Sequence, residues 1–132
     1  MEKKIKELII DTMNKEEGFT FSNSYKLIEI DDDYCIFEGN ISESSLNPYK
    51  IAHGGYIFGL ADTCAGALAC TNGKEAVTTN ASVMYLKPIS CKKIIAKAKF
   101  LKKGKKISNI EVEIVDEKGS LLSKVYFEFF NV

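Results

Sequence analysis

Residues 54–73 have the sequence GGYIFGLADTCAGALACTNG, in which almost every residue is apolar or small. The stretch is long enough for a helix of about five turns. Its apolar residues would lie nearly all the way round such a helix, so we expect the rest of the fold to enclose it. Small residues along it, among them Gly55, Gly59 and Gly66, would let a sheet approach closely.

The flanking segments predict an antiparallel sheet. Strand-like runs occupy residues 24–30 and 34–39, a polar loop occupies 42–51, and alternating apolar residues predict strands at 77–86, 94–100, 110–114 and 121–129. Turns at 102–105 and 117–120 would close hairpins, with Lys97 opposite Glu111. We therefore predict an α+β fold in one domain, residues 1–132. A long central helix is wrapped by a curved antiparallel sheet, and helical spacing at 2–16 places an N-terminal helix within residues 1–18.

The composition excludes several classes of protein. A hydrophobic content of 45% allows a buried core, Asp62 interrupts the longest apolar stretch so that no transmembrane helix is expected, and the first residues do not resemble a secretory signal. The net charge is zero, which disfavours nucleic-acid binding. The charge is uneven, because residues 1–80 carry 7 Lys and 13 acids, whereas residues 81–132 carry 11 Lys and 5 acids.

The cysteines do not predict a metal site. Cys35, Cys64, Cys70 and Cys91 form no CxxC pair, and the chain has one histidine. Free thiols without a signal sequence are typical of a cytoplasmic protein.

Asp62 is the only ionisable side chain between His53 and Lys74. A carboxylate in the most apolar segment of a chain is costly to bury without a partner, and such exceptions often mark functional sites. The alternative is that Asp62 lies on an exposed stripe of the helix or caps a kink.

His53-Gly54-Gly55 directly precedes the predicted helix. A helix N-terminus offers free N–H groups and a positive dipole end, so this motif predicts a site for an anion or an oxyanion. The alternative is a glycine-containing helix start with a capping histidine. Gly55 and Asp62 are two turns apart, roughly 10 Å. One reacting carbonyl would not reach both in a single chain, so either one residue acts alone or two antiparallel helices of a dimer share the site.

Residues 47–55, NPYKIAHGG, are followed by Leu60-Ala61-Asp62-Thr63, which gives the spacing N-x5-H-G-G-x6-D. This set resembles the signature of the hotdog-fold acyl-CoA thioesterases, in particular the phenylacetate-degradation (PaaI-type) group. Tyr85-Leu86-Lys87-Pro88 and Lys103-Gly104-Lys105 also resemble that family, and the likeness covers roughly residues 20–131.

The resemblance implies a hydrolase that cleaves an acyl-CoA thioester, built as an edge-to-edge homodimer that often pairs again into a tetramer. It implies that the Gly55 N–H binds the thioester oxygen and that Asp62 of the partner subunit is the nucleophile or general base. Asn47 would orient the water or the carboxylate, His53 would support the oxyanion site, and Thr78 would supply a helping hydroxyl. Thioester hydrolysis by these groups requires no metal and no cofactor.

Further residues are candidates for contacting substrate. Residues 87–106 contain 9 Lys and no acid, which predicts a surface for the phosphates of coenzyme A or, alternatively, a solvated hairpin that resists aggregation. The phosphate candidates are Lys87, Lys102, Lys103, Lys105 and Lys106. An acyl pocket would form between the central helix and the partner subunit, near Tyr56, Phe58, Leu60 and Tyr85. Aromatic and medium-chain acyl groups both suit such a lining. Gly54 and Thr63 are further candidates for contacting substrate.

Two other functions compete with hydrolysis. A non-catalytic acyl-CoA sensor on the same fold would be joined to a DNA-binding segment, and about twenty N-terminal residues are too few for one. A hydratase or dehydratase would carry its acid and histidine in other motifs. The presence of Asp62 also disfavours the sensor, and the single histidine, directly before Gly54-Gly55, disfavours the hydratase or dehydratase. A purely structural protein would not explain Asp62.

Overall fold

The computed structural model describes all of residues 1–132. Six strands and three α-helices make up the fold, together with one short 3-10 helix. Along the chain they are α1 (Lys3–Met13), α2 (Gly18–Ser22), β1 (Tyr25–Ile30), β2 (Tyr34–Asn40), η1 (Glu43–Ser45), α3 (Gly54–Ala69), β3 (Ala76–Tyr85), β4 (Lys93–Lys102), β5 (Ile107–Val115) and β6 (Leu121–Asn131).

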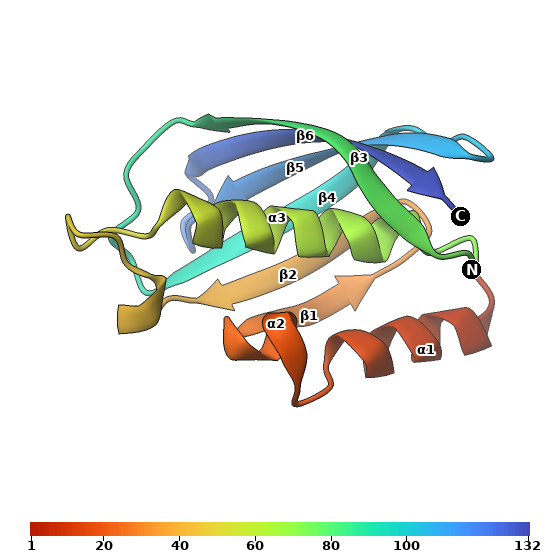
Figure 1. Cartoon of the computed structure of the whole chain (residues 1–132), viewed down its shortest axis with the longest axis horizontal. Helices are drawn as coiled ribbons and strands as arrows, with labels where there is room; N and C mark the ends of the chain where they lie inside the picture. The colour runs from red at the N-terminus through yellow and green to blue at the C-terminus, as the bar shows by residue number, and fades with distance from the viewer.

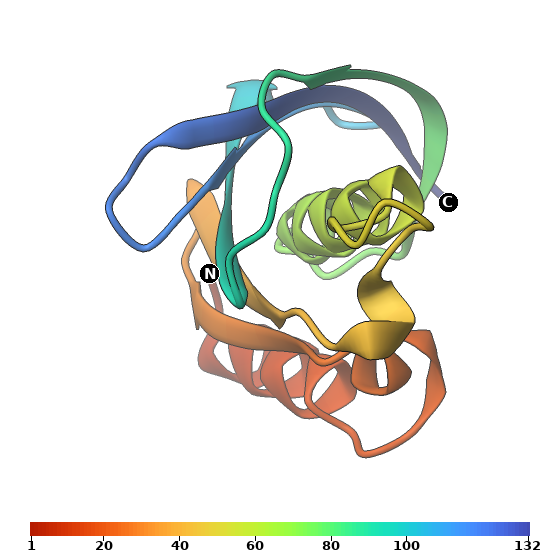
Figure 2. The same cartoon turned by 90° about the vertical axis from the view of Figure 1, so that its left-hand side faces the viewer.

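The strands form one antiparallel sheet in the order β1-β2-β4-β5-β6-β3. The sheet curves around α3, with β1 at one end of the curve and β3 at the other (Figures 1 and 2). The predicted α+β architecture, a long helix wrapped by an antiparallel sheet, is confirmed.

The core lies between α3 and the concave face of the sheet. Leu60, Cys64 and Leu68 are fully buried on one side of α3, against inward-facing residues such as Phe37 and Ile110. The helix begins at Gly54 as predicted and ends at Ala69, four residues before the predicted end at Gly73. The Cys70 N–H turns back to the Ala67 carbonyl, and Gly73 takes φ +83°, so the chain leaves the helix there. No helix in the structure is both long enough and apolar enough to cross a membrane.

The N-terminal segment differs from the expectation of one helix at residues 2–16. Helix α1 ends at Met13, and the next residue, Asn14, uses its Oδ1 to accept a hydrogen bond from the Leu27 N–H at 3.2 Å. Gly18 then takes φ +82°, which separates α1 from the short helix α2. Both helices lie beside β1 (Figure 2).

The register of the β4–β5 hairpin differs from the prediction by two residues. Lys99, not Lys97, pairs with Glu111, and their charged groups lie 3.0 Å apart. The connecting turn is centred further along the chain than predicted, and a bulge follows Phe100. A shift of two residues keeps every side chain on its predicted face, so the core assignment survives the error.

Candidate active site

His53 is the N-cap residue of helix α3, directly before its first residue, Gly54. The His53 Nδ1 accepts a hydrogen bond from the Gly55 N–H at 2.8 Å, and the His53 carbonyl accepts from Tyr56 and Ile57. This is a side-chain cap in which an imidazole nitrogen takes the place of the usual oxygen. The predicted oxyanion donor at Gly55 is therefore present at the helix N-terminus, and the His53 imidazole is bonded to it. A substrate oxygen would have to displace that imidazole.

Asn47 shapes the loop that leads to His53. Its Oδ1 accepts hydrogen bonds from the Tyr49 N–H at 2.9 Å and from the Ile51 N–H at 3.4 Å, around Lys50 at φ +67°. The Asn47 Nδ2 makes no hydrogen bond within the chain, so it is the end of the amide that can contact a substrate or a partner subunit.

A groove lies beside the start of α3, where β3 ends. The Tyr85 hydroxyl donates to the Gly54 carbonyl at 2.8 Å, and burial raises the pKa of this phenol. The approach is so close that a Cβ on Gly54 would lie 3.1 Å from the Tyr85 ring. The groove has a volume of about 340 Å³, and its lining includes Lys87 and Ile57. Gly54, Tyr85 and Lys87, three of the predicted substrate-binding residues, thus line the same groove.

Asp62 has a partner from the edge of the sheet. The Thr78 hydroxyl, on β3, donates to the Asp62 Oδ1 at 2.6 Å. Asp62 is half-buried, so its carboxylate is neither enclosed in the core nor fully exposed to water. Asp62 therefore lies on a partly exposed side of the helix, as the alternative interpretation of the sequence expected, and the Thr78 hydroxyl fixes the orientation of its carboxylate.

The expectation that α3 is enclosed on all sides is wrong along one stripe. Nine of its residues are buried against the sheet. The opposite side of the helix is exposed or half-buried, and it carries Gly55, Phe58, Gly59, Asp62, Thr63 and Gly66. We call these six residues the open stripe. Thr63 on this stripe bonds the Gly59 carbonyl at 2.7 Å and is satisfied within the helix.

Tyr56 is buried beside the open stripe, next to Tyr25. It is 5% exposed, packs 5.1 Å from the ring of Tyr25, and burial raises its pKa to about 12. The Tyr25 hydroxyl donates to the Tyr56 carbonyl at 2.6 Å. A substrate on the open stripe would not touch the Tyr56 ring.

The predicted phosphate-binding lysines fall into two groups. Lys87 lies in the groove at the start of α3, whereas Lys102, Lys103, Lys105 and Lys106 belong to the β4–β5 hairpin at the other end of the helix (Figure 1). The Lys106 carbonyl accepts from the Asn131 N–H, and the Asn131 side chain in turn donates to the Ala69 carbonyl, the last residue of α3. One chain does not bring these lysines to Gly55.

Sequence reasoning missed two aromatic residues that border the open stripe. A Cβ on Gly59 would lie 2.6 Å from the Tyr25 hydroxyl and 3.2 Å from the ring of Phe19 in α2. The inward position of Tyr25 in its strand could have identified it. Phe19 gave no such signal, because the sequence does not predict α2. In the structure no three His, Cys, Asp or Glu side chains come together to hold a metal.

Comparisons with known proteins agree with this fold. Residues 49–123 match the model of a family described as the thioesterase superfamily. Escherichia coli acyl-coenzyme A thioesterase PaaI is 30% identical over 93 residues, which cover 69% of this chain and 66% of that protein. The solved structure of E. coli PaaI superposes with a TM-score of 0.81 over 84% of this chain and 81% of that one, at 21% identity.

Two solved structures contain a coenzyme A species. A thioesterase protein from Streptococcus pneumoniae with coenzyme A is 28% identical, with a TM-score of 0.77, over 82% of this chain and 85% of that one. A Streptococcus mutans protein bound to acetyl-CoA is 26% identical, with a TM-score of 0.81, over 90% and 96%. In the S. pneumoniae protein an aspartate and a threonine sixteen residues apart have each been replaced by alanine.

The family match covers more than half of the chain, and the helix wrapped by an antiparallel sheet agrees with it. The resemblance to the PaaI-type group is likewise confirmed. The chain therefore belongs to the thioesterase superfamily, has the hotdog fold and is a thioester hydrolase.

Proposed function

We propose that the protein hydrolyses acyl-CoA thioesters at sites shared between two subunits. The observation that carries this proposal is that the Gly55 N–H and the Asp62–Thr78 pair lie on the same open stripe of α3, about 10 Å apart. Catalytic contacts are about 3 Å long, so one thioester carbonyl cannot reach both within a chain. Two antiparallel copies of α3 would bring Gly55 of one subunit to Asp62 of the partner subunit.

The bare edge of β3 supports such a dimer. This strand is the last of the sheet, and no other element pairs with its outer side. Val77 is 49% exposed, Met84 47% and Tyr85 50%. Unpaired edges that expose apolar residues tend to pair with another chain. Pairing of β3 with β3 of a second copy would bury these residues and also cover the open stripe.

The proposed reaction assigns a role to each of these groups. The thioester oxygen takes the Gly55 N–H in place of His53, and the helix N-terminus stabilises the negative charge that develops on this oxygen. Asp62 of the partner subunit either takes a proton from the attacking water or attacks the carbonyl carbon itself. The carbon–sulfur bond then breaks and coenzyme A leaves as a thiolate, which is protonated. Attack by water gives the free acid directly, whereas attack by Asp62 leaves an acyl anhydride on Asp62, which a water molecule then hydrolyses to the free acid and the carboxylate. Thr78 holds one carboxylate oxygen, leaving the other to react.

Two comparisons support an acyl-CoA substrate and these roles. Proteins with 28% and 26% identity hold coenzyme A and acetyl-CoA. The aspartate and threonine replaced in the S. pneumoniae protein have the same spacing as Asp62 and Thr78, sixteen residues.

The first test is chromatographic detection of free coenzyme A from a panel of aryl- and aliphatic acyl-CoAs, with Asp62→Ala beside the wild type. We expect hydrolysis by the wild type, its loss in Asp62→Ala, and retained acyl-CoA binding by that variant. Chromatography is preferable to a thiol-reactive dye, because four cysteines would give background. Binding without hydrolysis of any substrate by the wild type would favour an acyl-CoA sensor instead.

The second test asks whether the site is shared. Asp62→Ala and Gly55→Pro each remove one half of the site, and proline is tolerated in the first turn of a helix. A mixed dimer of the two variants would have one site with both defects and one intact site. We expect each variant alone to be inactive and the mixture to regain activity. A mixture that forms dimers but stays inactive would contradict a shared site.

A further inference from the structure

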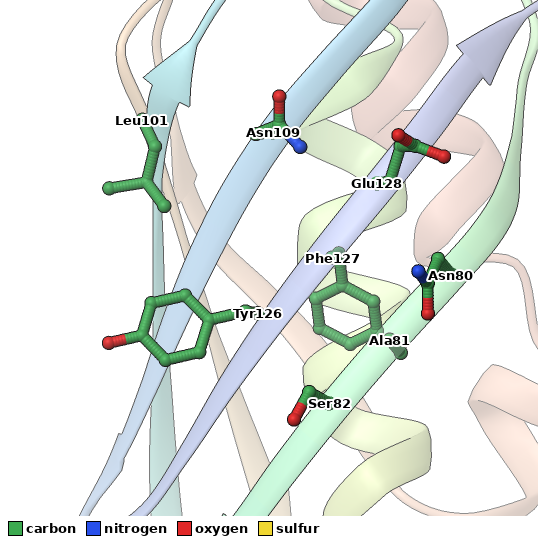
Figure 3. A pocket seen from close by; sticks show the side chains of 8 residues that line it. All are labelled: Asn80, Ala81, Ser82, Leu101, Asn109, Tyr126, Phe127 and Glu128. Carbon is green, nitrogen blue, oxygen red and sulfur yellow. The ribbon is translucent and has the colours of Figure 1, made fainter.

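A bulge in β3 determines which of its side chains reaches Asp62. Thr78 pairs with Phe129 and Asn80 pairs with Glu128, so Thr79 is an extra residue without a partner of its own. Beyond the bulge the faces alternate. Asn80 and Glu128 lie on the outer face of the sheet, whereas Ala81 and Phe127 point toward α3 (Figure 3).

Without the extra residue this alternation would put Thr79 on the inner face and Thr78 on the outer face, because a slip of one residue reverses every side chain. The bulge returns Thr78 to the inner face, beside Phe129, which is 3% exposed. It turns Val77 outward, where that side chain is 49% exposed. The 2.6 Å hydrogen bond from Thr78 to Asp62 therefore depends on the bulge.

One side-chain pair fastens the bulge from the outer face. The Thr79 hydroxyl lies 2.7 Å from the Glu128 carboxylate and 3.2 Å from the Glu128 carbonyl. A hydroxyl has one hydrogen, so the charged acceptor at the shorter distance takes it. Glu128 is itself anchored on β6, because its neighbours Phe127 and Phe129 are both buried in the core. The hydrogen bond therefore holds Thr79 against a strand that is itself fixed by the core.

We propose that Thr79 and Glu128 are positioning residues that hold the bulge of β3 so that Thr78 is aimed at Asp62. This inference rests on the proposed function, in which Asp62 reacts and Thr78 orients it. Thr79 and Glu128 lie on the opposite face of the sheet from Asp62 and would not touch substrate. Their effect on catalysis would pass through Thr78.

The main test is the kinetics of Thr79→Val, which removes the hydroxyl but keeps the branched shape that strands favour. We expect kcat to fall about tenfold while KM stays within about twofold, because a small misplacement of a catalytic group slows the reaction without weakening binding. Ser82→Ala is the matched control, since Ser82 lies on the same strand and outer face, paired with Tyr126. It should leave kcat, KM and the oligomeric state unchanged.

Variants of Glu128 and a double variant test whether Thr79 and Glu128 affect kcat through Thr78. Glu128→Gln keeps a side-chain acceptor for Thr79 and should retain near wild-type kcat, whereas Glu128→Ala leaves Thr79 only the carbonyl of residue 128 and should lower kcat, but by no more than Thr79→Val does. Thr78→Val combined with Thr79→Val should be no slower than Thr78→Val alone, because Thr79 acts through Thr78. A further tenfold loss in the double variant, or an unchanged kcat in Thr79→Val, would overturn the proposal.

A crystal structure of Thr79→Val separates failure of this inference from failure of the proposed function. We expect the Thr78 hydroxyl to have moved out of hydrogen-bonding distance of Asp62. Retention of that contact would overturn the positioning role whatever the activity. If Asp62→Ala and Thr78→Val hydrolyse acyl-CoA like the wild type, the proposed catalytic roles fail, and the crystal structure alone decides the role of Thr79 and Glu128.

Discussion

The two edge strands, β1 and β3, each contain one bulge, but the two bulges have different surroundings. In β1 the extra residue is Ile28, which is 51% exposed and makes no side-chain hydrogen bond. Helices α1 and α2 lie beside this edge, and Asn14 caps the Leu27 N–H. In β3 the extra residue is Thr79, which is bonded to Glu128, and no helix covers the edge.

A β-bulge therefore serves a different purpose at each edge of this sheet. At β1 a bulge, two helices and charged side chains protect the edge from pairing with another chain. At β3 the bulge turns a hydroxyl toward the carboxylate of Asp62, and the edge stays open. The open edge of β3 and the candidate catalytic residues lie on the same side of α3. A partner subunit that covered this edge would therefore also complete the proposed active site.

The largest effect on kcat is expected on the open stripe, for Asp62→Asn. Asparagine has the same shape and its Oδ1 can still accept from Thr78, but it can neither take a proton nor attack a carbonyl. We expect kcat to fall at least about 10³-fold with little change in the melting temperature. Steady-state kinetics and thermal unfolding measure the two quantities. A variant that kept a tenth of the wild-type kcat would remove Asp62 from the reaction.

The next largest effect is expected for Gly66→Lys, which places a long charged side chain on the open stripe. A Cβ at Gly66 meets only the ring of Phe129, at an ordinary 3.7 Å, so the single chain should accommodate it. A partner subunit packed on the open stripe should not accommodate it. We expect a folded monomer with about 10²-fold lower activity, measured by light scattering and by hydrolysis. Gly66→Ala is the matched control and should remain a dimer, and a dimeric, active Gly66→Lys would contradict the proposed interface.

The features that the sequence predicts well are set by local chemistry. The helix start at Gly54 and the role of Asp62 as an exception both follow from local chemistry, because a cap motif and a lone carboxylate in an apolar run are visible without a structure. Thr78 was predicted from family resemblance alone. Alternation along β3 points to Thr79 as the inward residue, and a bulge is set by tertiary contacts with β6 that the sequence pattern does not contain.

The errors have a common physical cause. The end of α3, the separation of α2 from α1 and the two-residue shift of the β4–β5 hairpin all concern boundaries and turns. These depend on how the chain leaves an element, and single residues such as Gly18 and Gly73 at positive φ decide it. Within one chain the five candidate lysines lie at opposite ends of α3, because strand β4 runs between Lys87 and the β4–β5 hairpin.

At the β1 edge, beside which α1 and α2 lie, we expect substitutions to lower the stability of the fold without lowering kcat. Ile9 of α1 is 7% exposed, and Ile9→Ala should lower the free energy of unfolding by about 2–3 kcal/mol. Leu8 is its matched control, because it is 67% exposed and Leu8→Ala should change that free energy by less than about 0.5 kcal/mol. Urea denaturation measures both. A fall in kcat of folded Ile9→Ala would show that the N-terminal segment also serves the site.

The smallest effect is expected when lysines are replaced. The comparison is between Lys87, which follows β3, and the lysines of the β4–β5 hairpin. Lys87 lines the groove beside Gly54, so Lys87→Ala should raise the KM for an acyl-CoA about three- to fivefold, and less at high salt. It should not change the KM for the same acyl group on N-acetylcysteamine, which lacks the nucleotide. Lys103 in the hairpin already contacts the Asp32 carbonyl and the Phe100 ring.

Replacing Lys102, Lys103, Lys105 and Lys106 together with alanine should therefore change the KM for acyl-CoA less than twofold. The result bears on the dimer as well, because antiparallel helices would place the hairpin end of the partner subunit toward Gly55 of the first. A rise in KM as large as that of Lys87→Ala, again absent with the short thioester, would mean that the hairpin crosses the interface to reach the nucleotide. The open edge would then supply phosphate contacts from both subunits as well as the reacting groups.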